Sequence, residues 1–255
     1  MRDGGPTGSF QGVGILRALI IDDERLARNG LRRLLRSHDN VEIVGEAANP
    51  DEAIRAIHKT CPDVLFLDVE MPGCNGFELL EKLEDVPVVI FTTAYDEYAV
   101  QAFEVSALDY LVKPITPERL AASLFRAQKA VATFSRDSAS KTAGESVLHQ
   151  IFVRDGDRCW IVRLTEIPLM ESEGSYTRLH FSGNAPLVYR SLTAIEERLE
   201  PKAFFRANRS QIINLNWVET VENELDGRLV VKLRGGKDVE ISRRQSRRLR
   251  ELLSL

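Results

Sequence analysis

The chain has 255 residues, of which 44% are hydrophobic and 28% are charged, the composition of an ordinary globular protein. No stretch reaches the ~18 consecutive apolar residues of a membrane-spanning helix. Composition therefore excludes a membrane bundle, a collagen-like repeat and a mostly disordered chain. The length suits two modest domains.

The formal net charge of -4 conceals a difference between the two halves. Residues 1–130 contain 14 Lys and Arg against 21 Asp and Glu, a balance of -7, whereas residues 131–255 contain 20 against 17, a balance of +3. Opposite balances indicate different tasks, and a basic C-terminal half is a weak sign of an anionic partner.

Residues 1–15 are glycine-rich and are expected to form a flexible leader, because they lack the apolar segment of a signal peptide. The three cysteines, Cys61, Cys74 and Cys159, are scattered and odd in number. This pattern is typical of reduced thiols and predicts a cytoplasmic protein. The four histidines show no metal-ligand spacing.

Between residues 16 and 131, short apolar runs alternate with helical patterns. The runs at 18–22, 41–47, 64–68, 86–93 and 109–114 are typical of strands buried on both faces of a parallel sheet. Helices are expected at 24–37, 51–59, 77–84, 97–104 and 117–131. In the first of them, an apolar stripe is expected to contain Leu26, Leu31, Leu34 and Leu35. This order predicts a doubly wound, flavodoxin-like α/β domain with five parallel strands.

Residues 132–146 are rich in Ser, Ala and Thr, and predict a linker. From 147 to 255, alternating apolar residues and glycine turns at 155–156, 183–184, 226–227 and 235–236 predict a mostly antiparallel β domain. Two short helices are expected, one after Ser191 and one after Ser242. In the second helix, Leu249, Leu252 and Leu253 are expected to face the core.

Polar residues stand at the ends of four of the five predicted parallel strands: Asp22 and Asp23, Asp68, Thr93, and Lys113. Each alone has an ordinary reading, such as a helix cap or a solvated lysine, but together they are expected to meet at one edge of the sheet. Three adjoining carboxylates repel one another and favour a hard divalent cation, for which Mg²⁺ is the best match. A cation and an ammonium around Asp68 would suit it to receive a phosphoryl group as a nucleophile.

These segments resemble the receiver domain of two-component response regulators. The matching motifs are LIIDDE at 19–24, FLDVEMPGCNGFELL at 66–80, FTTAY at 91–95 and DYLVKP at 109–114. The resemblance implies that a sensor histidine kinase phosphorylates Asp68, and that the only chemistry is gain and loss of this phosphoryl group.

The resemblance also implies roles for the surrounding residues. The implied Mg²⁺ ligands are Asp22, Asp23, Asp68 and the backbone carbonyl of Glu70. Thr93 matches the hydroxyl that follows the phosphoryl group, with Thr92 as a competitor, and Tyr110 matches the switch aromatic. Lys113 matches the lysine that precedes a typically cis proline, here Pro114.

In the C-terminal half, two arginine clusters stand out: ISRRQSRRLR at 241–250 and FFRANRS at 204–210. Arginines interleaved with aromatic residues suit phosphate contacts and base-edge contacts in DNA. Most charge runs, however, are only solvated surface, so the residues alone leave both readings open.

Residues 147–253 resemble the LytTR DNA-binding domain, in the segments 167–181, 204–218 and 239–249. The resemblance implies that loops and strand ends enter the major groove. The implied base-contacting side chains are Thr177, Arg209 and Arg244, and the neighbouring contacts are Ser175, Tyr176, Asn208 and Arg243. The core is expected to contain Phe204, Ile212, Ile213, Leu215 and Trp217.

The chain is therefore predicted to be a phosphorylation-dependent transcription regulator that binds double-stranded promoter DNA, forms a homodimer when phosphorylated and does not associate with membranes. One alternative keeps the receiver but makes the β domain a protein-interaction module. A second makes the first half a phosphatase or a flavin binder, although no second acid or base beside Asp68 supports hydrolysis of other substrates.

Overall fold

The computed structural model describes residues 14–94, 107–137, 148–156, 158–224 and 227–253. The chain forms two compact units, one with most of the residues before 138 and one with most of those after it. None of the helices in the described ranges is both long enough and apolar enough to cross a bilayer.

The first unit is built on a five-stranded parallel sheet. Its strands are β1 (Leu16–Ile21), β2 (Val41–Ala47), β3 (Val64–Asp68), β4 (Val88–Thr93) and β5 (Asp109–Val112). Their order is β2-β1-β3-β4-β5, and each neighbouring pair is parallel. The doubly wound fold is confirmed. The strand order reverses between β1 and β3, which is where ligands bind in such sheets.

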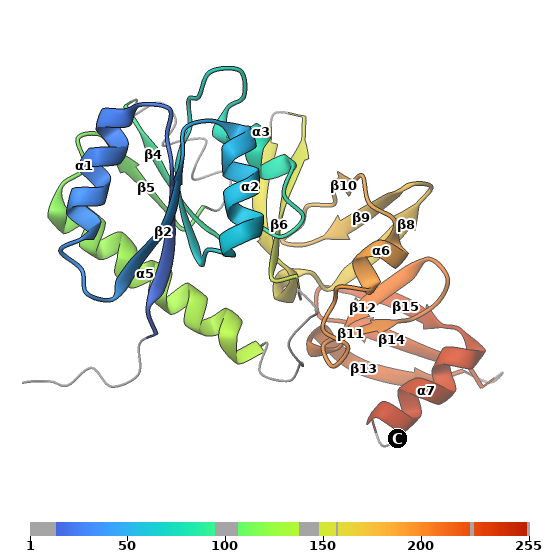
Figure 1. Ribbon diagram of the computed structural model, residues 1–255. Helices are drawn as coiled ribbons and strands as arrows, with labels where there is room; N and C mark the ends of the chain where they lie inside the picture. Colours follow the sequence, from blue (N-terminus) through green and yellow to red (C-terminus); the bar gives the residue numbers. More distant parts are fainter. Residues whose placement is uncertain (1–13, 95–106, 138–147, 157, 225–226, 254–255) are drawn as a thin grey trace, which may run out of the picture. The chain divides into compact units, whose positions relative to one another are not determined.

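Helices cover both faces of this sheet (Figure 1). The helices α1 (Arg25–Leu35) and α5 (Pro117–Asp137) pack on the face that contains Ile20 and Phe66. The helices α2 (Pro50–Thr60) and α3 (Gly76–Glu81) lie on the other face, where Phe77 contacts Phe91 with ring centroids 4.8 Å apart. The predicted helix at 97–104 lies outside the described residues.

Three expectations for these helices were wrong in detail. Leu26 is 77% exposed, whereas Leu31 and Leu35 are buried. Leu31 is five positions after Leu26, and a helix turns these two side chains about 140° apart. The helix α3 ends at Glu81, not at 84, and α5 continues to Asp137, past the expected end at 131.

In the described part of the second unit, every strand pair is antiparallel. A two-stranded ribbon is formed by β6 (Gln150–Asp155) and β7 (Arg158–Arg163). A five-stranded sheet has the order β10-β9-β8-β12-β11, and a three-stranded sheet has the order β13-β14-β15. Their strands are β8 (Leu169–Glu173), β9 (Tyr176–His180), β10 (Leu187–Val188), β11 (Phe204–Arg206), β12 (Gln211–Asn214), β13 (Val218–Asn223), β14 (Leu229–Leu233) and β15 (Lys237–Ile241).

The turns and helices follow the predicted pattern. Gly156 and Gly183 have φ angles of 62° and 78°, a region that favours glycine. The helix α6 (Leu192–Glu196) begins after Ser191, whose side chain accepts a hydrogen bond from the Ala194 amide at 3.2 Å. Single-turn 3₁₀ helices lie at Leu164–Glu166 and Leu215–Trp217. The expected mostly antiparallel domain with two short helices is confirmed.

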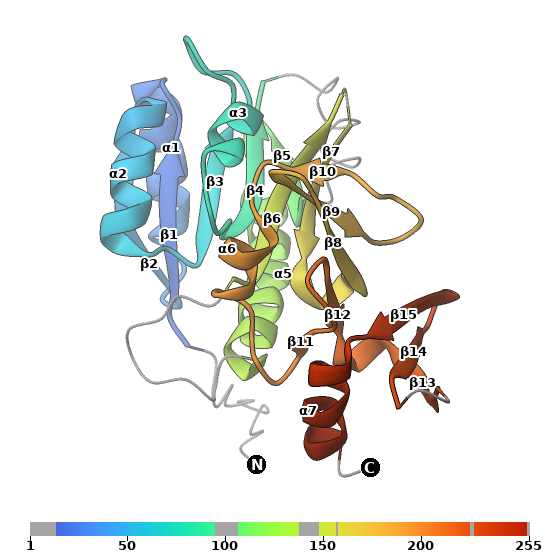
Figure 2. The ribbon, with the colours of Figure 1, turned by 90° about the vertical axis from the view of Figure 1, so that its right-hand side faces the viewer.

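The helix α7 (Arg243–Leu253) lies beside the three-stranded sheet (Figure 2). Leu249 is fully buried there, as expected, but Leu252 and Leu253 are 51% and 38% exposed, so their expected core positions were wrong. Of the other expected core residues, Phe204, Ile212 and Ile213 are buried, and Leu215 and Trp217 are half-buried against the core.

Candidate functional sites

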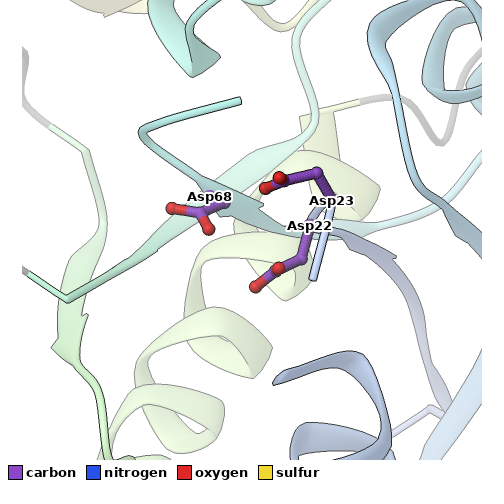
Figure 3. Close-up of side chains that lie close together, drawn as sticks. All are labelled: Asp22, Asp23 and Asp68. Carbon is purple, nitrogen blue, oxygen red and sulfur yellow. The ribbon is translucent and has the colours of Figure 1, made fainter. Parts of the chain in front are cut away.

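Three carboxylates meet at the edge of the parallel sheet (Figure 3). Asp22 and Asp23 follow β1, and Asp68 is the last residue of β3. One carboxylate oxygen from each lies within 4.8 Å of the others. Asp22 and Asp68 are only 3% and 5% exposed, so this negative charge is held largely away from water.

Lys113, which follows β5, is the cation of this site. Its Nζ lies 2.7 Å from Oδ2 of Asp22 and 2.7 Å from Oδ2 of Asp68. The peptide bond between Lys113 and Pro114 is cis, as the motif led us to expect. The backbone amide of Lys113 donates to the carbonyl of Thr93 at 2.7 Å, which ties the end of β5 to the end of β4.

The charges of these side chains favour the binding of a second, divalent cation. Burial raises the pKa of Asp68, Lys113 lowers it, and the charge of Asp22 raises it again, with a net rise. Burial lowers the pKa of Lys113, but its hydrogen bonds to Asp22 and Asp68 outweigh this, and the net shift is upward. Three carboxylates facing one ammonium form an oxygen-donor set that suits a hard divalent ion.

Backbone contacts hold these carboxylates in place. The guanidinium of Arg28 donates to the carbonyls of Asp22 and Asp23 at 2.7 and 3.1 Å. The amide of Glu70 donates to Oδ1 of Asp68 at 3.2 Å. Arg28 was not predicted, and its place one turn into α1 was the only sequence signal for it.

An open pocket gives solvent access to the cluster. Its lining residues are Asp23, Glu24, Asp68, Glu70, Met71, Pro72, Asn75, Thr93, Ala94 and Lys113. Within the described part of the chain, Thr93 lines this pocket and Thr92 does not, so Thr93 is the better placed hydroxyl. Tyr110 is buried in β5, at 8% exposure.

In the second unit, three segments that the sequence singled out adjoin one another. The amide of Ser172 in β8 donates to the carbonyl of Ser210 at 2.7 Å, which places the β8–β9 turn beside the β11–β12 turn. The amide of Ser242 donates to the carbonyl of Ala207 at 3.0 Å, which places the start of α7 beside the same turn. One surface therefore contains all three segments.

Most of the expected DNA-contacting side chains are exposed on these segments. Arg209 lies on the β11–β12 turn, Arg243 and Arg244 begin α7, and Ser175 lies on the β8–β9 turn, and all four are exposed. Tyr176 is 43% exposed and stacks edge-on against the more exposed Tyr189, with ring centroids 5.1 Å apart.

Two expected contact residues are placed differently. Thr177 is completely buried, and its hydroxyl donates to the carbonyl of Arg190 at 2.8 Å, which argues against direct contact with a base. Asn208 is half-buried, and its side-chain amide is bonded within the protein. Successive side chains of a strand point to opposite faces of the sheet. In β9, Tyr176 therefore faces solvent and Thr177, the next residue, faces the core.

Arg206, which belongs to the arginine cluster at 204–210 but had no predicted role of its own, makes contacts within the protein. Its Nε donates to the carbonyl of Asn208 at 2.7 Å, another of its nitrogens donates to the carbonyl of Arg209, and Nη1 pairs with Glu196 of α6 at 2.8 Å. Arg206 therefore anchors the β11–β12 turn to α6.

Comparison with known proteins defines the class of both units. Residues 18–125 match the family model of the response regulator receiver domain, and residues 157–254 match that of the LytTr DNA-binding domain. These two domains define a DNA-binding response regulator.

Full-length relatives match nearly the whole chain. The transcriptional regulatory protein BtsR of Salmonella typhi is 36% identical over 244 residues, which cover 94% of this chain and 100% of the relative. BtsR of Escherichia coli K12 is 35% identical, and the sensory transduction protein LytT of Bacillus subtilis is 33% identical, each with the same coverage. The chain belongs to the family of response regulators that join a receiver domain to a LytTR DNA-binding domain.

Family membership establishes the general function as phosphorylation-dependent regulation of transcription. The matched DNA-binding family favours this function over the protein-interaction alternative, and neither matched family model describes a phosphatase or a flavin binder.

Proposed function

We propose that Asp68 is the phosphoacceptor and that a sensor histidine kinase is the donor. A carboxylate oxygen of Asp68 attacks the phosphorus, the bond from phosphorus to the histidine nitrogen breaks, and an aspartyl phosphate forms. The observation that carries this proposal is the placement of Asp68 between Lys113, at 2.7 Å, and two further carboxylates in a pocket open to solvent.

Each surrounding residue has a proposed task. Asp22, Asp23, Asp68 and the carbonyl of Glu70 would hold Mg²⁺, which when bound neutralises phosphoryl oxygens during transfer. Lys113 binds one phosphoryl oxygen, and the Thr93 hydroxyl donates to another. Tyr110, which is buried in β5, is the proposed switch residue.

Labelling with acetyl phosphate tests this assignment. The parent protein should gain one phosphoryl group in the presence of Mg²⁺, and the Asp68→Asn variant should gain none. Asp51→Asn, which changes an exposed aspartate in the first turn of α2, is the matched control and should be labelled like the parent. Labelling of Asp68→Asn at another residue would contradict the assignment.

We further propose that Arg209 and Arg244 read base edges, with Ser175, Tyr176 and Arg243 contacting the backbone or neighbouring bases. Their support is exposure on three segments joined by backbone hydrogen bonds. A bidentate arginine–guanine pair discriminates by about 1–3 kcal/mol. Thr177 is buried, and we propose that it supports β9 beneath this surface without contacting a base.

Selection of duplexes from a random-sequence library tests the proposed contacts. Arg209→Ala and Arg244→Ala should lose preference at particular base positions, and the parent's affinity should fall steeply with salt. Lys202→Ala is the charge-matched control, because Lys202 is exposed just before β11, at the opposite end of that hairpin from Arg209. Equal affinity of the parent for selected and random duplexes would contradict specific recognition.

The remaining parts of the proposal concern the assembly and the cell. Phosphorylation is proposed to favour a homodimer on promoter DNA, and light scattering with and without acetyl phosphate tests this. The domain boundaries are proposed at 16–131 and 147–255, and the protein is proposed to act in the cytoplasm.

A further inference from the structure

A chain of side-chain hydrogen bonds crosses the second unit and ends at the turn that presents Arg209. Its members come from β15, β9, β8, β12 and the β11–β12 turn. In spatial order they are Lys237, His180, Glu171, Gln211 and Asn208. Residues as far as 66 positions apart in the sequence are joined in this chain.

The ionised carboxylate of Glu171 decides the protons in the first part of the chain. Because this carboxylate only accepts, Nε2 of His180 donates to it. In a neutral ring Nδ1 then has no proton, and Lys237 Nζ lies 3.0 Å from Nδ1 and 3.4 Å from Nε2. Burial, and next the charge of Lys237, lower the pKa of His180 in spite of Glu171, which agrees with a neutral ring.

The second part is equally determined. Oε1 of Glu171 accepts from Nε2 of Gln211 at 2.8 Å, because an ionised carboxylate only accepts. The opposite end of the same amide, Oε1 of Gln211, accepts from Nδ2 of Asn208 at 2.7 Å. The orientation of the Gln211 amide is therefore imposed from both sides.

The chain ends on the backbone of the turn. Oδ1 of Asn208 accepts from the amide of Ser210 at 2.9 Å, and Nδ2 also donates to the carbonyl of Glu240 at 2.9 Å. The residue between Asn208 and Ser210 is Arg209. Its backbone is thus fixed by side-chain contacts on both neighbours, while its own side chain is exposed.

We propose that Glu171 and Gln211 are positioning residues for DNA recognition, which set the geometry of Arg209 through Asn208. This inference rests on the proposed function, in which Arg209 contacts a base. A turn that is already held in its binding geometry loses less entropy on association, and an arginine aimed correctly discriminates between bases. Neither Glu171 nor Gln211 needs to contact DNA for this role.

Two isosteric variants break the chain of hydrogen bonds, because each replaces an acceptor by a donor, or a donor by an acceptor, at a single position. In Glu171→Gln, the new amide faces a donor whichever way it turns, either Gln211 or the Nε2 proton of His180. In Gln211→Glu, two carboxylates face each other. In both variants two like groups face each other at half-buried positions. Each variant should therefore lower the affinity ratio between specific and random duplex about tenfold, which corresponds to about 1.4 kcal/mol.

The double variant, Glu171→Gln with Gln211→Glu, restores every hydrogen bond. The amide at 171 accepts from His180 and donates to the carboxylate at 211, which accepts from Asn208. Its net charge equals that of the parent. The affinity ratio should therefore recover to within about threefold of the parent, whereas a general loss of stability would add up in the double variant.

The experiment measures affinity for two duplexes, one recovered by selection from a random-sequence library with acetyl phosphate-treated parent protein and one of random sequence. Deuterium uptake of the peptide that spans 207–210 is measured in the absence of DNA. Faster uptake and a lower affinity ratio in both single variants, with recovery in the double variant, are expected. Unchanged uptake in the single variants, or no recovery in the double variant, overturns the inference. If the parent protein shows no preference for the selected duplex, the proposed function is overturned instead. The deuterium uptake then still decides whether the chain of hydrogen bonds holds the turn.

Discussion

A β-carbon built on Gly76 would lie 2.5 Å from the carbonyl oxygen of Asp68. Real β-carbons do not approach backbone atoms this closely, and the neighbouring Leu67 side chain would lie at 3.2 Å. The first residue of α3 therefore touches the backbone of the proposed phosphoacceptor. The amide of Gly76 also donates to the carbonyl of Val69 at 2.9 Å, which leaves the helix little freedom to withdraw.

Gly76→Ala is expected to displace α3 or Asp68, lower the free energy of unfolding by about 1–3 kcal/mol and slow labelling by acetyl phosphate. Thermal unfolding and the labelling rate measure the two effects. Gly30→Ala in α1 is the control, because nothing lies within 4 Å of its added methyl group. There the helix should gain about 0.5–1 kcal/mol. Equal behaviour of the two variants would contradict the contact.

Removal of one carboxylate from the cluster should weaken Mg²⁺ binding. Asp23→Asn is expected to lower the affinity by at least about tenfold, because a hard cation depends on the charge of its oxygen ligands. Isothermal titration with MgCl₂ measures the affinity, and chelation by EDTA should stop labelling of the parent by acetyl phosphate. The Asp51→Asn protein should bind Mg²⁺ like the parent, and an unaffected Asp23→Asn protein would remove Asp23 from the ligand set.

Loss of the contacts by which Arg206 holds the β11–β12 turn should weaken binding to a selected duplex. Arg206→Met keeps the aliphatic stem but removes the hydrogen bonds to the carbonyls of Asn208 and Arg209. We expect affinity for a selected duplex to fall about tenfold while salt dependence stays nearly constant, because the charge of Arg206 is already paired. A reduction of the salt slope by about one would instead identify Arg206 as a phosphate contact.

We expect the stability of the first unit to depend on pH through Asp109. Burial raises the pKa of Asp109, but hydrogen bonds from Ser123 and Arg126 outweigh this and hold it below the ordinary 3.8. Asp109→Asn should cost about 1–3 kcal/mol.

A depressed pKa contributes stability that is present above the unfolded-state pKa and is lost as pH falls through the folded-state pKa. The difference between parent and Asp109→Asn should therefore be equal at pH 7 and pH 5 and should shrink only below about pH 4. Thermal unfolding at a series of pH values measures it. A difference that already shrinks between pH 7 and pH 5 would show that another group is responsible.

Local patterns predicted the receiver unit and its pocket well. Asp22, Asp68 and Lys113 stand at strand ends, and parallel strands must bring those ends to one edge. In α7, by contrast, apolar residues near the end of the chain suggested a buried face, but only Leu249 reaches the core. Leu252 and Leu253, at the end of the helix, are exposed, and no periodicity in the sequence reveals where the contact with the core ends.

The sequence by itself determined the two domains, the acidic pocket and the hairpins of the second unit, because periodicity, glycine turns and strand-end motifs act over short distances. Only the tertiary structure decided that Thr177 is buried, that Gly76 contacts Asp68 and that Glu171 is linked to the Arg209 turn. These relationships depend on strand register and on the direction of individual donors and acceptors across the fold. Local spacing in the sequence does not encode them.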